Sequence, residues 1–153
     1  MTNNEKRTTL YDFVIQTDGG SRGNPGPSAI GVVIKSTDGS LKKEYGEYIG
    51  ITTNNDAEYQ AVIFGLKKLK HLIGKEKAGH AHIEVVTDSE LLERQLNGHF
   101  KIMDPKIQQH FMELWNLKVD FGDVAYRHVY REDNQDADRM VNAALDKETN
   151  RLL

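Results

Sequence analysis

The sequence predicts an α/β domain whose mixed five-stranded sheet is flanked by helices. Three segments with strand character come first, at residues 10–17, 28–35 and 41–51, and turn residues separate them. Apolar residues at helical spacing follow, and two more strand-like segments then alternate with helices up to the C-terminus. The order βββαβααβα is typical of a sheet that combines an antiparallel meander with strands reached through helices.

The first strand leads into a single carboxylate. Val14 and Ile15 favour extended backbone, and the two glycines that follow Asp18 interrupt it. Asp18 thus stands at the carboxyl end of a buried strand, where ligands collect in α/β sheets. Gly19 and Gly20 allow another backbone or a phosphate group to come close. Taken alone, an aspartate before a glycine also fits an ordinary turn.

A long helix follows the first three strands. Val62, Leu66 and Leu69 recur at helical spacing and predict its buried face. Residues 52–56 offer several side chains that can cap its N-terminus, and Gly74 offers an end. The helix therefore lies against the sheet along one apolar stripe.

The second half of the chain alternates strand and helix. Residues 81–87 predict a fourth strand that ends at Asp88, and a short helix follows to Leu96. Asp104 and Pro105 open another helix, and residues 123–129 predict the fifth strand. In the helix after Pro105 we assign to the core Ile107, Phe111, Leu114, Trp115 and Val119. In the last helix we assign to it Ala137, Val141, Ala144 and Leu145.

Length and composition fit one domain. We place it at residues 10–147, between an N-terminal tail at 1–9 and a C-terminal tail at 148–153. No apolar run approaches the length of a membrane span, so we expect no membrane association and a cytoplasmic location. The absence of cysteine excludes disulfides and thiolate zinc sites. A net charge of −3 argues against a protein that holds nucleic acid through overall charge, but it permits a nucleic-acid enzyme.

Three further carboxylates occupy positions comparable to that of Asp18. Glu58 falls on the apolar face of the long helix, where a carboxylate is costly unless it is paired or binds a metal. Asp88 ends the fourth strand, and Asp138 shares a face of the last helix with Val141. Each also has an ordinary explanation: an N-cap for Asp88, and stabilisation by the helix dipole for Glu58 and Asp138.

One shared cause explains all four carboxylates better than four separate ones. If the first and fourth strands are parallel neighbours, Asp18 and Asp88 lie side by side at the same end of the sheet. Clustered carboxylates repel one another unless cations or protons neutralise them. Mg²⁺ prefers such oxygen ligands, and two ions can stabilise the attacking and the leaving oxygen of a phosphoryl transfer. The residues therefore predict phosphodiester hydrolysis without a protein nucleophile.

Four segments, taken in order, resemble the ribonuclease H type 1 family over nearly the whole chain, from about residue 10 to 146. They are TDGGSRGNPGP at 17–27, TTNNDAEYQAVIFGL at 52–66, TDSELLERQLNG at 87–98 and RHVYREDNQDADRMVNAAL at 127–145. The resemblance implies a ribonuclease H-like fold and a metal-dependent endoribonuclease. Its expected partner is an RNA–DNA hybrid, whose RNA strand it would cut to 5′-phosphate and 3′-hydroxyl ends, and we expect it to act as a monomer.

The resemblance also assigns the four carboxylates. Asp18, Glu58, Asp88 and Asp138 would bind two Mg²⁺ ions, for which Mn²⁺ can substitute. One ion is expected at Asp18 and Asp138, where it would hold the attacking water. The other is expected at Asp18, Glu58 and Asp88, where it would stabilise the leaving 3′ oxygen.

The family's contacts with the hybrid fall on a second set of residues. The resemblance gives as substrate-binding residues Asn24, Thr53, Asn54 and Asn55, and we add Gly19 and Gly20 because glycines let a phosphate come close. The asparagine amides both donate and accept hydrogen bonds, which suits contact with a 2′-hydroxyl in the minor groove. Thr53 would help hold a phosphate of the DNA strand. Helix capping remains the alternative role for Asn54 and Asn55.

A cation near the last carboxylate is also expected, and the sequence offers two. His128 lies ten residues before Asp138, a spacing common in the family, whereas the compact stretch that follows it makes Arg131 an equal candidate. Arginine stays protonated, so it could act electrostatically but not as an acid.

Two departures from the family pattern concern substrate binding. The basic, tryptophan-containing protrusion of many bacterial members is missing, since residues 97–106 form a short connection with only Lys101 and Lys106. Ile51 stands where many relatives carry arginine. We therefore expect weak, salt-sensitive binding of the hybrid. The alternatives are an inactive nucleic-acid-binding module of the same fold and a hydrolase of other phosphoesters.

Overall fold

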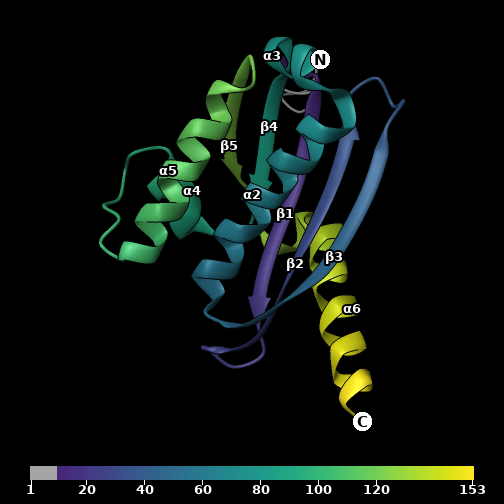
Figure 1. Cartoon of the computed structure of the whole chain (residues 1–153), viewed down its shortest axis with the longest axis vertical. Coiled ribbons are helices and arrows are strands. Elements are labelled where there is room, and N and C mark those ends of the chain that lie inside the picture. The colour runs from purple at the N-terminus through teal and green to yellow at the C-terminus, as the bar shows by residue number, and fades with distance from the viewer. Residues whose placement is uncertain (1–9) are drawn as a thin grey trace.

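The computed structural model describes residues 10–153 and shows a five-stranded sheet with helices on both faces (Figure 1). The predicted tail at residues 1–9 lies outside the described residues. The elements in chain order are β1 Phe13–Ser21, β2 Gly26–Ser36, β3 Lys42–Thr52, α2 Asn54–Ile73, α3 Lys75–His80, β4 His82–Thr87, α4 Glu90–Leu96, α5 Pro105–Val119, β5 Asp123–His128, the 3-10 turn η1 Arg131–Asp133, and α6 Gln135–Leu152.

The strands lie in the order β3-β2-β1-β4-β5, which confirms the predicted mixed sheet. The first three strands form an antiparallel meander, because short turns connect them. β4 is reached through α2 and pairs parallel to β1, and β5 pairs parallel to β4. The carboxyl ends of β1, β4 and β5 therefore meet at one end of the sheet, which fulfils the condition that the sequence analysis set for β1 and β4.

β1 begins and ends later than predicted, since it runs from Phe13 to Ser21 rather than over residues 10–17. Its parallel pairing with β4 stops at Thr17 opposite Thr87, but its antiparallel pairing with β2 continues to Ser21. The glycines after Asp18 end the side-chain packing without ending the backbone ladder, which β2 maintains. Asp18 therefore lies inside β1, at the point where one of its two neighbours ends.

The two faces of the sheet are covered unequally. On one face α2 and α5 enclose the main core, in which Ile15, Leu66 and Leu114 are buried (Figure 1). The buried stripe of α2 matches the spacing seen in the sequence. The ends of the helix also match, since Thr53 caps its N-terminus within the predicted segment and Gly74 ends it. On the other face α6 packs across β1, β2 and β3 through a smaller cluster that contains Val141 and Leu145.

Glycines allow α6 to lie directly on the sheet. A Cβ atom at Gly31 of β2 would collide with the carbonyl oxygen of Ala137 and lie 3.0 Å from the Cβ atom of Met140. A Cβ atom at Gly46 of β3 would lie 2.6 Å from the carbonyl oxygen of Met140. Because α6 carries Asp138 between these contacts, this close approach sets the height of that carboxylate above the sheet.

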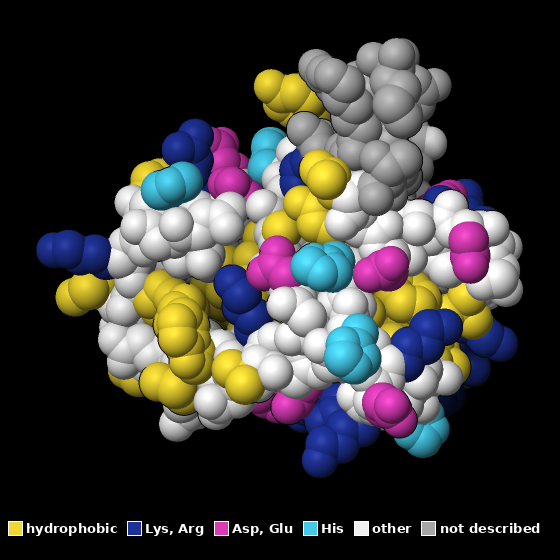
Figure 2. All heavy atoms as spheres, turned by 90° about the horizontal axis from the view of Figure 1, so that it is seen from above, with side chains coloured by type: hydrophobic (Ala, Val, Ile, Leu, Met, Phe, Trp, Pro, Cys, Tyr) yellow, Lys and Arg dark blue, Asp and Glu magenta, His cyan; other side chains and the backbone are white. Residues whose placement is uncertain are grey.

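Three elements differ from the expectations. α3 was not predicted, and α6 continues to Leu152 through the segment that we assigned to a C-terminal tail from residue 148. The assignment of Trp115 and Val119 to the core is wrong, because they are 58% and 75% exposed. α5 buries only the narrow stripe that faces α2, and hydrophobic side chains remain exposed on its side of the molecule (Figure 2).

From the sequence we expected no membrane association, and the hydropathy of the helices can be compared with that expectation. Among residues 10–153, no helix has both the length and the apolar character that crossing a membrane requires.

Replacing Gly31 with alanine tests the close packing of α6. We expect Gly31→Ala to lower the free energy of unfolding by about 1–3 kcal/mol, because the added methyl group pushes α6 away from β2. Gly79→Ala is the matched control, since its Cβ atom would meet nothing within 4 Å and should leave stability unchanged or slightly raised. Urea unfolding measures both variants, and equal stabilities would contradict the packing argument.

Candidate metal centre

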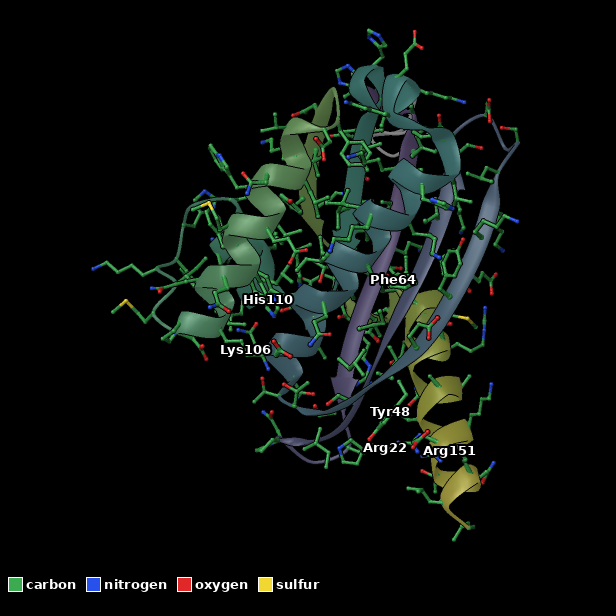
Figure 3. The ribbon with its side chains drawn as sticks, viewed as in Figure 1. Arg22, Tyr48, Phe64, Lys106, His110 and Arg151 are labelled. Atoms are coloured by element: carbon green, nitrogen blue, oxygen red, sulfur yellow. The ribbon has the colours of Figure 1, made fainter. Side chains whose placement is uncertain are left out.

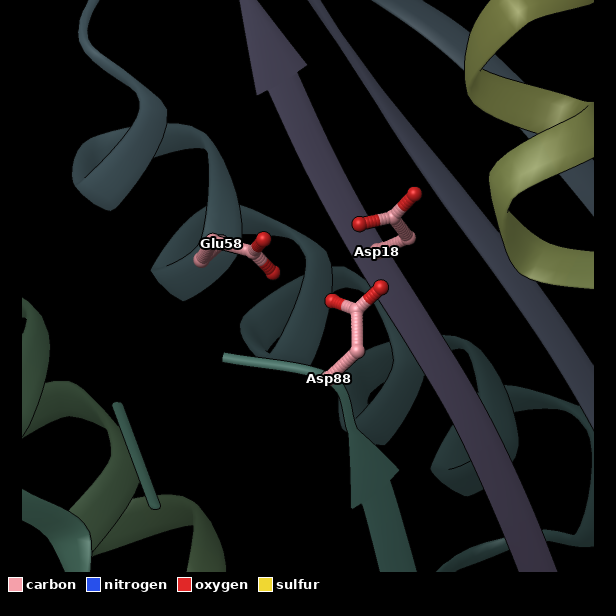
Figure 4. A group of neighbouring side chains, drawn as sticks. All are labelled: Asp18, Glu58 and Asp88. Carbon is pink, nitrogen blue, oxygen red and sulfur yellow. The ribbon is translucent and has the colours of Figure 1, made fainter. Parts of the chain in front are cut away.

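Three carboxylates from three separate elements meet at one edge of the sheet. Asp18 comes from β1, Glu58 from the first turns of α2 and Asp88 from the residue after β4 (Figure 4). One ligand oxygen of each lies within 4.8 Å of the others. Asp18 and Glu58 are buried, and Asp88 is partly exposed. The sequence pattern suggested that Asp18 and Asp88 share this end of the sheet, and the family resemblance added Glu58; the structure brings all three together.

The strand register explains two of the positions. Thr17 and Thr87 form the last parallel pair between β1 and β4, so Asp18 and Asp88 are the next residues on adjacent strands. Asp88 does not cap α4, because Ser89 accepts the hydrogen bond from the Leu92 amide. The ordinary explanation of Asp88 as an N-cap is therefore wrong.

Glu58 reaches Asp18 because α2 passes very close to β1. Gly19 lies against the backbone of α2, where any Cβ atom would collide with the Ala57 carbonyl group. The Gly19 amide donates a hydrogen bond to a carboxylate oxygen of Glu58 at 3.2 Å. Gly19 thus serves the site by its lack of a side chain and by its backbone donor.

Asn134 connects the fourth carboxylate to the others. It is fully buried just before α6, and its side-chain amide donates a 2.9 Å hydrogen bond to the Thr17 carbonyl oxygen. This bond ties the start of α6 to β1 immediately before Asp18, and Asp138 follows in the first turn. The sequence analysis missed Asn134, although its place inside the fourth family-like segment was a signal.

The four carboxylates line one open cavity of about 450 Å³. Its lining residues are Asp18, Gly19, Gly20, Ser21, Arg22, Asn54, Glu58, Asp88, Arg131, Asp138, Val141, Asn142 and Leu145. The cavity continues from the carboxylates along α6 toward the loop between β1 and β2. The sequence analysis did not single out Arg22 or Asn142, though Arg22 lies within the first family-like segment and Asn142 follows Asp138 by four residues.

Burial and mutual repulsion disfavour ionisation in this cluster. Burial, together with the charges of Asp88 and Asp138, raises the pKa of Asp18 to about 8. Burial and the charges of Asp18 and Asp88 raise the pKa of Glu58 well above its ordinary value. Burial also raises the pKa of Asp88, which the positive charge of Arg131 opposes. At neutral pH the cluster thus retains protons that a cation could replace.

The expected substrate residues are divided between the cavity and its surroundings. Gly19, Gly20 and Asn54 line the cavity, whereas Asn24, Thr53 and Asn55 are not among its lining residues. The side-chain oxygen of Asn54 accepts from the Ser21 amide at 2.8 Å, and that of Asn24 accepts from the Asn54 amide at 3.0 Å. These bonds fix the β1–β2 loop to the start of α2.

The two candidate cations occupy different places. Arg131 lines the cavity, and its guanidinium lies 3.4 Å from a carboxylate oxygen of Asp138. His128 ends β5 opposite Thr87, packs edge-on against Tyr130 and is not among the cavity's lining residues. The geometry therefore brings Arg131, rather than His128, to the carboxylates.

The donor set suits a hard divalent cation. All of the clustered ligand atoms are carboxylate oxygens, which Mg²⁺ and Ca²⁺ prefer and which softer metals do not select. The partly exposed Asp88 and the open cavity leave room for water and for a substrate. The arrangement can hold a metal ion next to a bound phosphate group.

Comparison with known proteins identifies close relatives. A family profile described as "Reverse transcriptase-like" matches residues 16–144. Ribonuclease HI of Halobacterium salinarum is 41% identical over 129 residues, which cover 84% of this chain and 62% of the relative. A bifunctional protein of Mycobacterium tuberculosis is 38% identical over 134 residues, 87% of this chain but 35% of its own length. The chain thus spans less than two thirds of these relatives.

A solved structure extends the likeness to the fold and the hybrid. The crystal structure of LC11-RNase H1 in complex with an RNA/DNA hybrid superposes with a TM-score of 0.84. The two chains are 40% identical, and the match covers 90% of this chain and 99% of the other. The sheet order and its flanking helices are therefore those of a ribonuclease H fold.

The raised pKa of Asp18 predicts how the metal-free protein responds to pH. The folded protein binds a proton at Asp18 up to about pH 8, whereas the unfolded chain releases it near 3.8, so stability falls as pH rises between these values. Asp18→Asn should make the protein in EDTA more stable than the parent at pH 8, by at least about 1.4 kcal/mol, the equivalent of one pKa unit. At pH 4 the two should differ little.

Asp136 provides the control, because its hydrogen bond with Arg139 lowers the pKa of its carboxyl group. Asp136→Asn should slightly lower stability at pH 8, the opposite sign. Urea unfolding at both pH values measures these differences. A gain for Asp18→Asn that did not grow with pH would contradict the repulsion argument.

Proposed function

The chain belongs to the ribonuclease H type 1 family, and from this premise we propose that it is an endoribonuclease that hydrolyses the RNA strand of RNA–DNA hybrids. The observation that carries the proposal is the convergence of Asp18, Glu58 and Asp88, with ligand oxygens within 4.8 Å of one another. Asp138 lines the same cavity from the opposite side. The complex of LC11-RNase H1 with an RNA/DNA hybrid supports this substrate class.

The proposal includes a metal requirement. Asp18, Glu58, Asp88 and Asp138 would hold two Mg²⁺ ions, with Mn²⁺ as a substitute, because their clustered oxygens match the ligand preference of these ions. When bound, such ions activate water and stabilise a leaving oxygen, which would yield 5′-phosphate and 3′-hydroxyl products. Asp18 is the shared ligand in this scheme, since the charges of both Asp88 and Asp138 act on it.

Other residues of the chain would orient the substrate. Asn54 lies at the cavity with its oxygen already bonded to the Ser21 amide, so its amide hydrogens remain directed to other acceptors such as a 2′-hydroxyl. Asn24 is held against the start of α2 and extends the same polar surface. Arg131 would add positive charge beside Asp138. These contacts would select RNA by its 2′-hydroxyl groups.

Cleavage of labelled duplexes tests the proposal against its alternatives. With Mg²⁺ or Mn²⁺ we expect cleavage of an RNA–DNA hybrid but not of matched RNA or DNA duplexes. Asp18→Asn should reduce the rate at least about a hundredfold, because it removes charge from the shared ligand. Asp136→Asn makes the same chemical change on α6, at a residue that does not line the cavity, and should retain activity.

Two results would contradict the proposal. An intact hybrid under both metals, with the protein folded, would favour a nucleic-acid-binding module. Cleavage of a small aryl phosphate without cleavage of the hybrid would favour a different phosphoester hydrolase.

Substitution of the two candidate cations tests which one serves the reaction. Arg131→Gln should lower kcat about tenfold, because this charge lies at the carboxylates and favours their ionised forms. His128→Asn should change kcat by less than about twofold. Steady-state cleavage of the hybrid measures both variants, and a larger loss for His128→Asn would reverse the assignment.

A further inference from the structure

The cavity extends well beyond the carboxylates. Its wall on α6 is formed by Asp138, Val141, Asn142 and Leu145, which share one face of the helix at spacings of three and four residues. Seven residues of helix rise by about 10 Å. The opposite wall follows β1 from Asp18 into the β1–β2 loop. The cavity is thus a trough with carboxylates at one end.

A guanidinium lies at the other end of the trough. Arg22, in the β1–β2 loop, points toward α6, and its Nη2 atom lies 2.6 Å from a carboxylate oxygen of Asp146 (Figure 3). Its backbone amide donates to the Pro27 carbonyl oxygen at 2.8 Å, so the loop holds the residue in place. The side chains of Arg22 and Asp146 are 43% and 65% exposed. An ion pair this exposed is weak, and one carboxylate oxygen leaves most of the five guanidinium donors available.

Charge makes this guanidinium important to a polyanionic ligand. The chain carries a net charge of −3, and four carboxylates line the trough. The cationic side chains that line it are Arg131, beside Asp138, and Arg22. A strand that ran from the carboxylates along α6 would therefore pass from Arg131 at one end of the trough to Arg22 at the other.

On the basis of the proposed function, we infer that Arg22 binds a phosphate of the RNA strand a few nucleotides from the one that is cleaved. A nucleic-acid strand carries a phosphate about every 3.4 Å along the helix axis, so the trough reaches past the cleaved position. The strand in the trough is the RNA, because the trough is continuous with the carboxylates that would receive the scissile bond. Val141 and Leu145 offer apolar contacts to the sugars between the two phosphates.

Asp146 opposes this contact by competing for Arg22. When the RNA phosphate binds bidentately to the guanidinium, the weak pair with Asp146 is exchanged for a stronger one. Removal of Arg22 should therefore weaken binding, whereas removal of the Asp146 charge should strengthen it. Two exposed neighbours thus have effects of opposite sign on one ligand.

Binding of a fluorescent RNA–DNA hybrid in EDTA, which prevents cleavage, tests the inference. Arg22→Gln should weaken binding about three- to tenfold and reduce the slope of log K against log salt by about one. Asp146→Asn should tighten binding in the parent but have little effect in the Arg22→Gln background. Both residues are exposed, so the variants are expected to fold.

The pair of Arg151 and Glu148 on the last turns of α6 is the matched control, because it carries the same charges and does not line the trough (Figure 3). Arg151→Gln should leave the affinity and the salt slope near those of the parent. An equal effect of Arg22→Gln and Arg151→Gln would show only general charge attraction and would overturn the inference.

Neutral methylphosphonate groups, placed at one position at a time, test which strand is bound. A methylphosphonate at one position of the RNA strand, near the cleaved bond, should weaken binding to the parent protein. With that modified hybrid, Arg22→Gln should cause no further loss of affinity. The assignment to RNA would be overturned if only a methylphosphonate in the DNA strand, or none at any position, removed the effect of Arg22→Gln.

Cleavage separates this inference from the function on which it rests. If the parent cleaves the hybrid in Mg²⁺ while Arg22→Gln binds it as the parent does, the inference alone fails. If the parent neither binds nor cleaves the hybrid, the proposed function fails.

Discussion

Mutual repulsion among buried carboxylates is the constraint on which the rest of the structure depends. Asp18, Glu58 and Asp88 bring oxygens within 4.8 Å of one another, where full ionisation is strongly disfavoured without a cation. The fold holds them there through the end of the β1–β4 pairing, the close passage of α2 over Gly19, and the Asn134 bond that ties α6 to β1. The repulsion lowers the free energy of unfolding of the metal-free protein, and a bound metal ion can restore it.

Most of this arrangement could be predicted from the sequence, because it follows from local pattern. A carboxylate at each strand end and a glutamate on an apolar helix face needed only strand and helix periodicity. Local pattern could not predict three other features: where β1 ends, that Trp115 is exposed, and that Arg131 rather than His128 lies at the carboxylates. They depend on which strand continues to pair, which face of α5 finds a neighbour, and how η1 turns the chain, and each of these is a contact between distant segments.

Under the proposed function, this acidic protein would act on a polyanion and would need its cations in particular places. The connection at residues 97–104, between α4 and α5, is short, and Ile51 is 74% exposed without a charge. The basic protrusion and the arginine that the family resemblance led us to look for are therefore not at these positions. Arg131 and Arg22 lie instead at opposite ends of the trough that contains the carboxylates. On the proposed path of the cleaved strand, these cations would favour correct positioning over general affinity and would make binding sensitive to salt.

The most direct test of the central claim is the number of protons released when the metal-free protein binds Mg²⁺ or Mn²⁺. Isothermal titration calorimetry at pH 7, in buffers with different ionisation enthalpies, measures the number of protons released. Because the pKa of Asp18 is raised to about 8 and that of Glu58 is also raised, we expect binding to release at least about one proton, and fewer at pH 9. Asp18→Asn should weaken binding and reduce the release. Binding without proton release, or binding that Asp18→Asn leaves unchanged, would contradict the account.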